Sequence, residues 1–352
     1  MDNIIKQRNN KQVAIWLLLG VLMIIVQVLI GGITRLTESG LSITEWKPIT
    51  GALPPMNDIA WQAEFDRYKV TDQFKYVHQN FSLSDFKGIF FWEWFHRLWA
   101  RFMGLVFLIG FIYFLVTKKF DKKMILPMVI LFFLGAIQGA IGWFMVKSGL
   151  VPEKYFVGHV ELATHFIAAM VLLSYTLWFA LSLLQSPAKK VVNAGLQKFM
   201  VAIMVVLFFQ LVYGAFMAGL KAAVTAPTWP AINGKMIPAM SELTPWTKNL
   251  VNNNITVHFI HRGLAYLSLI LITGWWFASK NLAGTKLFAS LRLIVISVVW
   301  FQVVLGILTV VNSVYPARLV VLGVAHQFTG ISLLICVVSL LFVLKSRAPA
   351  HA

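Results

Sequence analysis

The sequence contains few charged residues, and acidic residues are the scarcest of them. Only 12% of its 352 residues are charged, and 13 Asp and Glu stand against 30 Lys and Arg. The chain has one cysteine, Cys336, which excludes an intrachain disulfide and any metal or redox centre built from several cysteines. Because Cys336 lies inside an apolar segment, we expect it to pack as a small hydrophobic side chain.

Hydrophobic residues make up 59% of the chain. They form runs of about 20 residues, long enough to cross a bilayer. The runs are apolar on every face, whereas helices of a soluble core carry one apolar stripe. We therefore predict an all-α integral membrane protein with eight transmembrane helices. The expected spans are 13–30, 96–116, 124–146, 158–184, 199–220, 255–278, 287–311 and 319–344.

The net charge of +17 is distributed in a way that indicates membrane topology and excludes a nucleic-acid partner. Lys and Arg gather before the first span, after the last span, and in alternate connections such as KKFDKK at 118–123. The positive-inside rule then places both termini in the cytoplasm. The first apolar run has no small-residue cleavage site, and no Arg- and Ser-rich presequence precedes it. We expect a retained first helix and a multi-pass protein of a bacterial inner membrane.

The two halves of the chain carry the same residues in the same order. Spans 2 and 6 open with His-Arg, and spans 4 and 8 each hold a histidine near the outer end. Further aligned pairs are Gln27 with Gln210, Gly31 with Gly214, Gln138 with Gln302, Gly142 with Gly306, and Pro152 with Pro316. This pattern predicts two parallel-repeat four-helix bundles, 1–190 and 191–352. The long outer loop after span 1, which has no equal in the second half, indicates that the halves differ in task.

Four histidines follow this repeat, His96 with His165 and His261 with His326. Even-numbered spans run parallel, so they lie diagonally in a bundle, about 12–14 Å apart. That distance suits a flat macrocycle held by one imidazole from each side, as in haem-binding bundles. A lone intramembrane histidine is commonly an interhelical hydrogen bonder. Four histidines in duplicated register are better explained by two haem sites.

The other four histidines are weaker candidates for haem ligands. His258 shares a helix face with His261 and could ligate in its place. His159 has no partner in span 8, and we expect it at a helix interface. His78 lies in a polar loop and His351 in the tail, where we expect both to be solvated.

Arginines stand beside the predicted ligands. Arg97 and Arg262 each follow a histidine of the repeat, and Arg101 lies one turn beyond Arg97. We expect them where haem propionates would reach the outer surface.

A carboxylate distinguishes the two halves. Glu93 lies three residues before His96, where the second half has His258. Two interpretations are open. Glu93 could form an ion pair with Arg97 at a favourable helix N-terminus. It could instead be functional, as carboxylates beside intramembrane cofactors commonly are.

Several long stretches resemble the haem A synthase family, in order along essentially the whole chain. They are GGITRLTESGLSITEWKPITGALPP (31–55), EWFHRLWAR (93–101), VHFIHRGLAY (257–266), QVVLGILTVV (302–311) and AHQ (325–327). The resemblance implies an oxidoreductase that converts haem O into haem A for cytochrome oxidase. In that reaction the C8 methyl of the porphyrin becomes a formyl group through two successive hydroxylations.

The resemblance also implies roles for individual residues. His261 and His326 would ligate a resident haem b, His96 and His165 would address the substrate haem, and Glu93 would be the essential carboxylate. The sequence lacks the paired loop cysteines of one group within the family, and so resembles the cysteine-free group.

Further expectations concern the outer side of the membrane. Arg35, Glu45, Trp46 and Lys47 would close the outer loop over the first site, with Arg35 or Lys47 as possible propionate partners. Both haem sites would lie near the periplasmic side. Possible partners are a haem O synthase and oxidase assembly factors, and the sequence does not identify the electron donor.

Two other functions fit part of this pattern. A dihaem b-type cytochrome that only transfers electrons explains four histidines but leaves Glu93 and the long outer loop without a task. A duplicated transporter would use intramembrane polar residues as a pathway and would show no haem absorbance. Haem A synthesis raises a difficulty of its own, because ligation by both His96 and His165 leaves the iron no open position for dioxygen. Either one histidine dissociates, or the methyl is oxidised without oxygen bound to that iron.

Overall fold

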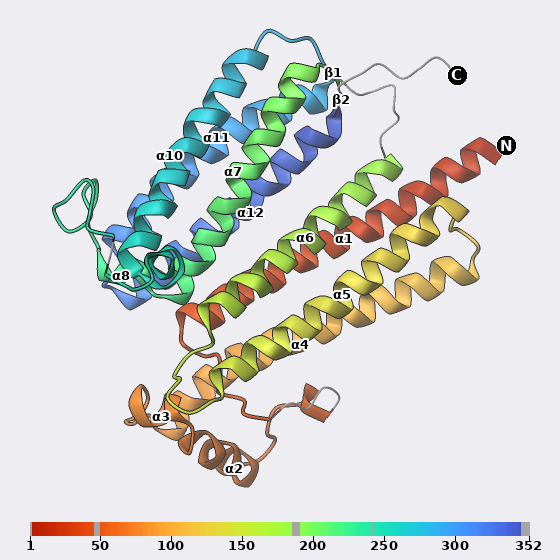
Figure 1. Cartoon of the computed structure of the whole chain (residues 1–352). Helices are drawn as coiled ribbons and strands as arrows, with labels where there is room; N and C mark the ends of the chain where they lie inside the picture. The colour runs from red at the N-terminus through yellow and green to blue at the C-terminus, as the bar shows by residue number, and fades with distance from the viewer. Residues whose placement is uncertain (1, 46–49, 185–190, 241, 346–352) are drawn as a thin grey trace.

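Eight long helices dominate the described part of the chain, each long and apolar enough to cross a membrane (Figure 1). The computed structural model describes all residues except 1, 46–49, 185–190, 241 and 346–352. The long helices are α1 (Asp2–Leu36), α4 (Leu83–Val116), α5 (Lys122–Gly149), α6 (His159–Leu184), α7 (Ala194–Gly219), α10 (Asn254–Ser279), α11 (Lys286–Val311) and α12 (Pro316–Val343). The predicted all-α membrane protein with eight spans is confirmed.

Short elements connect these helices. The connection from α1 to α4 contains η1 (Thr50–Ala52), α2 (Asp58–Lys69) and α3 (Asp72–Tyr76). The connection from α7 to α10 contains α8 (Ala222–Thr225), η3 (Trp246–Lys248) and α9 (Asn249–Asn252). Two short parallel strands, β1 (Val191–Val192) and β2 (Leu344–Lys345), pair near the start of α7 and the end of α12.

Helix α4 begins at Leu83, well before the predicted start at 96, and this corrects the sequence-based boundary. A capping box causes the early start: Ser82 and Asp85 each bond the other's backbone N–H. The added turns pack Phe86 against Phe65 and Tyr68 of α2, with ring centroids 5.1 and 5.2 Å apart. The outer loop is therefore shorter and more helical than its length in sequence implied.

The long helices form two groups of four (Figure 1). In the first group, α1 packs against α4 and α6, and α5 packs against α6. In the second group, α7 and α11 each pack against α10 and α12. The groups meet through α1, α6, α7 and α12, whose buried apolar side chains form a shared core. That the two groups arise from one repeated unit stays a prediction from the sequence.

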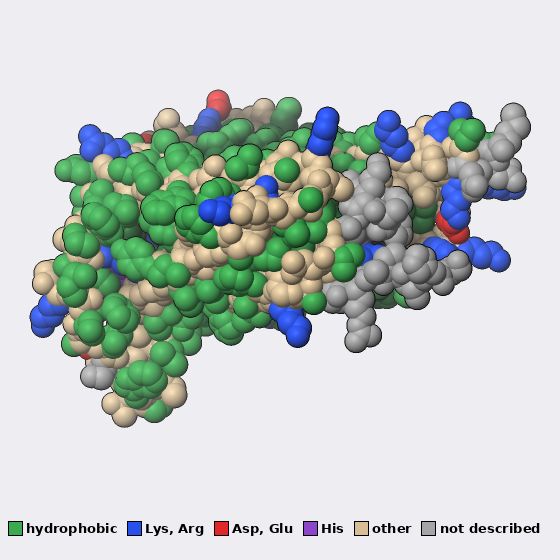
Figure 2. Space-filling view, turned by 90° about the horizontal axis from the view of Figure 1, so that it is seen from above, with side chains coloured by type: hydrophobic (Ala, Val, Ile, Leu, Met, Phe, Trp, Pro, Cys, Tyr) green, Lys and Arg blue, Asp and Glu red, His purple; other side chains and the backbone are tan. Residues whose placement is uncertain are grey.

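The start of α1 and the end of α12 lie at the same end of the molecule as the turns that join α4 to α5 and α10 to α11 (Figure 1). Helices α2, α3 and α8 lie at the opposite end. Hydrophobic side chains cover most of the face shown in Figure 2, as a lipid-facing surface requires. Which end faces the cytoplasm stays a prediction.

Candidate functional site

A cavity of about 1530 Å³ lies between the helices and is lined by both groups. Small-molecule pockets commonly measure about 300–1,000 Å³, so this cavity has room for more than one large ligand. Its lining is mainly apolar. The structure brings nine predicted site residues to it: Arg35, Glu93, His96, Arg97, Arg101, His165, His261, Arg262 and His326.

In the first group, each candidate histidine lies against a glycine of the neighbouring helix. A β-carbon at Gly31 of α1 would lie 3.1 Å from Nε2 of His96 on α4. A β-carbon at Gly142 of α5 would lie 2.9 Å from Cε1 of His165 on α6. Both distances are shorter than an ordinary carbon contact. The glycines therefore admit imidazole rings that any larger residue would displace.

The second group repeats this arrangement. A β-carbon at Gly214 of α7 would lie 3.2 Å from Cε1 of His261 on α10. One at Gly306 of α11 would lie 3.1 Å from Cε1 of His326 on α12. The aligned glycines noted in the sequence thus correspond to four histidine–glycine contacts.

Four glutamines lie one helical turn before these glycines, and each contacts the same histidine as its glycine. Nε2 of Gln138 donates to the His165 carbonyl at 3.2 Å. Nε2 of Gln302 lies 3.3 Å from Nε2 of His326. Equivalent contacts join Gln27 to the His96 carbonyl at 3.2 Å and Gln210 to the His261 ring at 3.5 Å. Gln138 also lies with Nε2 3.3 Å from Nδ1 of His165. The glutamines that contact a ring nitrogen can orient the imidazole, as hydrogen-bond partners of ligand histidines do in metal sites.

The rings of His261 and His326 have the spacing that a shared metal ion requires. Their centroids lie 6.4 Å apart with an interplanar angle of 77°. Two metal–nitrogen bonds of about 2 Å each, with the ring radii added, give a centroid separation of about 6 Å. Nδ1 of each ring is buried and has no hydrogen-bond partner within the described ranges. This pair fits a haem iron.

His258, the competing ligand, is buried and accepts a hydrogen bond from Nε of Arg262 at 2.9 Å. His159 lies between α6 and α7, where its ring packs against Phe216 at a centroid distance of 5.8 Å. A β-carbon at Gly219 would lie 2.5 Å from Cβ of His159. His159 therefore occupies the contact between the two groups, in agreement with the expectation from sequence.

Glu93 is 4% exposed and accepts hydrogen bonds at both carboxylate oxygens. Oε2 accepts from Oγ of Ser42 at 2.7 Å and from the backbone N of Ile43 at 2.9 Å. Oε1 accepts from Nη2 of Arg97 at 2.6 Å. The predicted Glu93–Arg97 ion pair is thus present. The predicted place at a helix N-terminus is wrong, because Glu93 lies in the third turn of α4.

Arg97 and Arg262 hold the connections that precede α4 and α10 in their own groups. Nη2 of Arg97 donates to the Ile43 carbonyl at 3.1 Å, and Nη1 donates to that of Glu45 at 3.3 Å. Nη2 of Arg262 donates to the Thr228 carbonyl at 2.5 Å. Each arginine also donates a hydrogen bond to the side chain four residues before it: Arg97 to Glu93, and Arg262 to His258.

The remaining outer residues differ in how they are placed. Nη2 of Arg35 donates to the Gly219 carbonyl at 3.0 Å, while its buried Nε has no hydrogen-bond partner within the described ranges. Arg101 lines both the main cavity and a smaller outer pocket of about 370 Å³, which Glu45 also lines. Trp46 and Lys47 lie outside the described residues.

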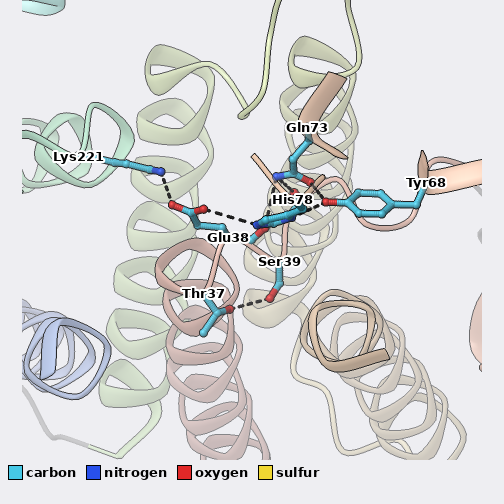
Figure 3. Close-up of polar contacts among 8 residues, drawn as sticks. Thr37, Glu38, Ser39, Tyr68, Gln73, His78 and Lys221 are labelled. Carbon is cyan, nitrogen blue, oxygen red and sulfur yellow. Dashed lines mark hydrogen bonds and ion pairs between the residues drawn. The ribbon is translucent and has the colours of Figure 1, made fainter. Parts of the chain in front are cut away.

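A partly buried polar cluster joins the two groups at the end of the molecule that carries α2 and α3, and sequence reasoning missed it (Figure 3). His78, expected to be solvated, is 6% exposed and lies with Nδ1 2.6 Å from the Tyr68 hydroxyl. Its Nε2 lies 3.7 Å from Oε2 of Glu38, whose other oxygen accepts from Nζ of Lys221. The interaction with His78, followed by that with Lys221, lowers the pKa of Glu38 to about 2. Burial raises the pKa of Tyr68.

No local signal in the sequence could have revealed this cluster. Glu38 and His78 belong to the first outer connection, and Lys221 comes from the second group. Polar residues in a long loop are ordinarily solvated. Only the folding of α2 and α3 over the end of α1 buries them.

Comparison with known proteins places these residues in context. The chain matches the COX15-CtaA family, described as cytochrome oxidase assembly protein, over residues 14–338. A protein of Parvibaculum lavamentivorans named "Heme A synthase" is 39% identical over 320 residues, covering 91% of this chain and 90% of the relative. A protein of the same name from Flavobacterium johnsoniae is 38% identical, covering 93% of this chain and 96% of the relative. Another, from Bradyrhizobium diazoefficiens, is 40% identical, covering 96% of this chain and 92% of the relative.

Proposed function

The chain belongs to the COX15-CtaA family of cytochrome oxidase assembly proteins, and we propose that it carries out the reaction for which its relatives are named. That reaction is the oxidation of the C8 methyl of haem O to the formyl group of haem A. The observation that carries the proposal is one cavity in which four histidines meet four glycines, with the buried carboxylate of Glu93 one helical turn from His96.

The second group, 191–352, is the proposed site of a resident haem b. His261 and His326 would hold its iron, and their ring spacing supports this assignment. Gln210 and Gln302 would orient the two rings. When bound, haem b supplies electron transfer.

The first group, 1–190, is the proposed site of the substrate. Haem O would lie between His96 and His165, with its reacting edge towards Glu93. Ser42, Ile43 and Arg97 hold the Glu93 carboxylate, so it has a fixed position relative to His96. There it can accept or deliver a proton, or stabilise positive charge that develops at the methyl carbon.

The propionates of the two porphyrins are assigned to the outer arginines. Arg97 and Arg262 already bind loop carbonyls, so each would connect a propionate to the loop above it. The buried Nε of Arg35 has no hydrogen-bond partner among the described residues. Arg35 also lines the cavity, at the contact between the groups. Arg101 lies one turn further along α4 and lines both cavities.

The proposed setting is a bacterial inner membrane with both termini in the cytoplasm and the porphyrin sites towards the periplasm. Lys and Arg gather at the connections on the side of the termini, in accordance with the positive-inside rule. A haem O synthase would supply the substrate, and oxidase assembly factors would receive the product. An electron donor is also required.

The experiment that tests this function is expression of the chain with a source of haem O, followed by extraction and pyridine haemochrome analysis. We expect haem b and newly formed haem A, and we expect Glu93→Ala to retain haem b but form little haem A. Haem b alone, even with haem O supplied, would instead support a dihaem cytochrome. Absence of any haem would support a transporter.

A further inference from the structure

The two helix groups differ in how they close around their part of the cavity. In the second group, α10 packs along α11, so the four helices close on all sides. Helices α4 and α5 hold the equivalent places in the first group, and they do not pack along one another. Instead, α4 packs against α1, and α5 packs against α6. One side of the first group is therefore open.

The cavity reaches this open side. Gly104 of α4, and Gly135 and Gly139 of α5, line it, and a β-carbon at any of the three would meet nothing within 4 Å. Leu108 of α4 and Phe132 of α5 also line the cavity, yet they are 52% and 60% exposed. Side chains that line a cavity and are also exposed mark its mouth. Because both helices span the membrane, this mouth faces lipid.

The same positions are filled in the second group. Counted from the aligned glutamines, Val299 of α11 stands where α5 has Gly135, and it is 1% exposed. Counted from the aligned histidines, Leu269 of α10 stands where α4 has Gly104, and it packs against the core. The first group thus lacks the side-chain volume that closes the second.

We propose that the space between α4 and α5 is a lateral entrance through which an isoprenoid-tailed porphyrin passes between the bilayer and the His96–His165 site. This inference rests on the proposed function, under which the first group exchanges haem O for haem A while the second retains haem b. Haem O carries a long farnesyl chain, which would stay in apolar surroundings while the porphyrin enters. The apolar side chains of Leu108 and Phe132 at the mouth are suited to that tail.

The test is to close the entrance with the residues of the second group. The double substitution Gly104→Leu and Gly135→Val adds side chains where the structure has open space. The full-length chain, purified with its haem b and placed in vesicles, is mixed with vesicles that contain haem O. Uptake of haem O is followed by the change in Soret absorbance, and haem A by extraction. The matched control is Gly263→Leu on α10, which also has open space around it and does not line the cavity.

We expect the double variant to take up haem O at least about tenfold more slowly than the wild type. Its haem b content should not change, and Gly263→Leu should match the wild type. The mild variant Gly135→Ala adds one methyl group, so its rate of haem O uptake should lie between those of the wild type and the double variant. Slower uptake by Gly135→Ala than by the wild type therefore tests the inference even if the double variant is unstable. Equal uptake by wild type, Gly135→Ala and the double variant would overturn the entrance. A change of oligomeric state with unchanged uptake would overturn it too, and would assign the open side to a second copy of the chain.

The uptake of haem O tests the entrance, and the formation of haem A tests the proposed function. If the wild type takes up haem O but forms no haem A when dioxygen and a chemical electron donor are supplied, the proposed function fails while the entrance stands. If haem A forms equally fast in all variants at limiting haem O, the entrance fails while the function stands.

Discussion

Ser42 and Glu93 meet in a buried hydrogen bond, in which the serine hydroxyl donates to Oε2 of the carboxylate at 2.7 Å. Ser42 follows the end of α1, and Glu93 belongs to the third turn of α4. The backbone N of Ile43 donates to the same oxygen at 2.9 Å. The proposed catalytic carboxylate therefore also anchors the first outer loop, and an effect of its mutation could come from either role.

Variants of the two residues separate these roles. Ser42→Ala removes one donor but leaves Ile43 and Arg97 in place, so we expect haem A formation to fall about tenfold, for a loss of roughly 1–2 kcal/mol. Glu93→Gln keeps the shape of the side chain and loses its charge, and we expect it to abolish nearly all turnover. Extracted haems measured by chromatography give both rates. Ser297→Ala, on an exposed face of α11, is the control. If Glu93→Gln forms haem A as fast as Ser297→Ala does, Glu93 serves only to anchor the loop.

The two histidine pairs should respond differently to mutation. His261→Ala or His326→Ala should remove the haem b signal, because a single remaining imidazole would have to hold the iron. His96→Ala or His165→Ala should keep haem b and lose haem A formation. Pyridine haemochrome spectra of the four purified variants measure this, with each pair serving as the control for the other. Loss of haem b in the His96 variant but not in the His261 variant would reverse the assignment of the two groups.

The histidine–glycine contacts predict a sharp dependence on residue size. Gly306→Val should displace the His326 ring, because the added atoms would lie within about 3.1 Å of it. Overpacking of this kind costs about 1–3 kcal/mol, so we expect a lower thermal midpoint and weakened haem b binding. Gly263→Val has free space and serves as the control. Unchanged haem b affinity in Gly306→Val would show that the close approach is not needed.

The cluster around Glu38 predicts a dependence of stability on pH. Its folded-state pKa of about 2 lies below 4.5, the ordinary value for a glutamate. The stabilisation is therefore fully present above pH 4.5 and is lost as the pH falls towards 2. We expect Glu38→Gln to destabilise the protein by about 1 kcal/mol at pH 7, an amount already reduced for solvent screening at this half-buried site.

Thermal unfolding in detergent between pH 3 and pH 7 measures this effect. The difference between Glu38→Gln and the wild type should shrink as the pH falls. The control is Asp66→Asn, which changes an exposed carboxylate of α2. A difference that is the same at pH 3 and pH 7 would refute the electrostatic role of Glu38.

The amino-acid sequence by itself determined the features that depend on local composition and spacing. The length and polarity of each apolar run specify eight spans, because a helix that crosses lipid must satisfy its backbone internally and present apolar side chains. The repeat in spacing identified the four histidines, and the structure brings all four to one cavity. The aligned glycines were visible too, although their contact with the imidazole rings was not.

The tertiary structure decided what depends on residues far apart in the chain. The packing of Phe86 against α2 holds the first turns of α4, whereas the capping box that begins them is a local signal. The burial of His78 needs α2 and α3 folded over the end of α1, and Lys221 of the other group reaches the Glu38 carboxylate that His78 faces. The open side between α4 and α5 needs the packing of all eight helices. Hydrophobicity along the chain specifies which segments enter the membrane, but contacts between helices determine which of their faces meet, and those contacts are set by side-chain volumes on separate segments.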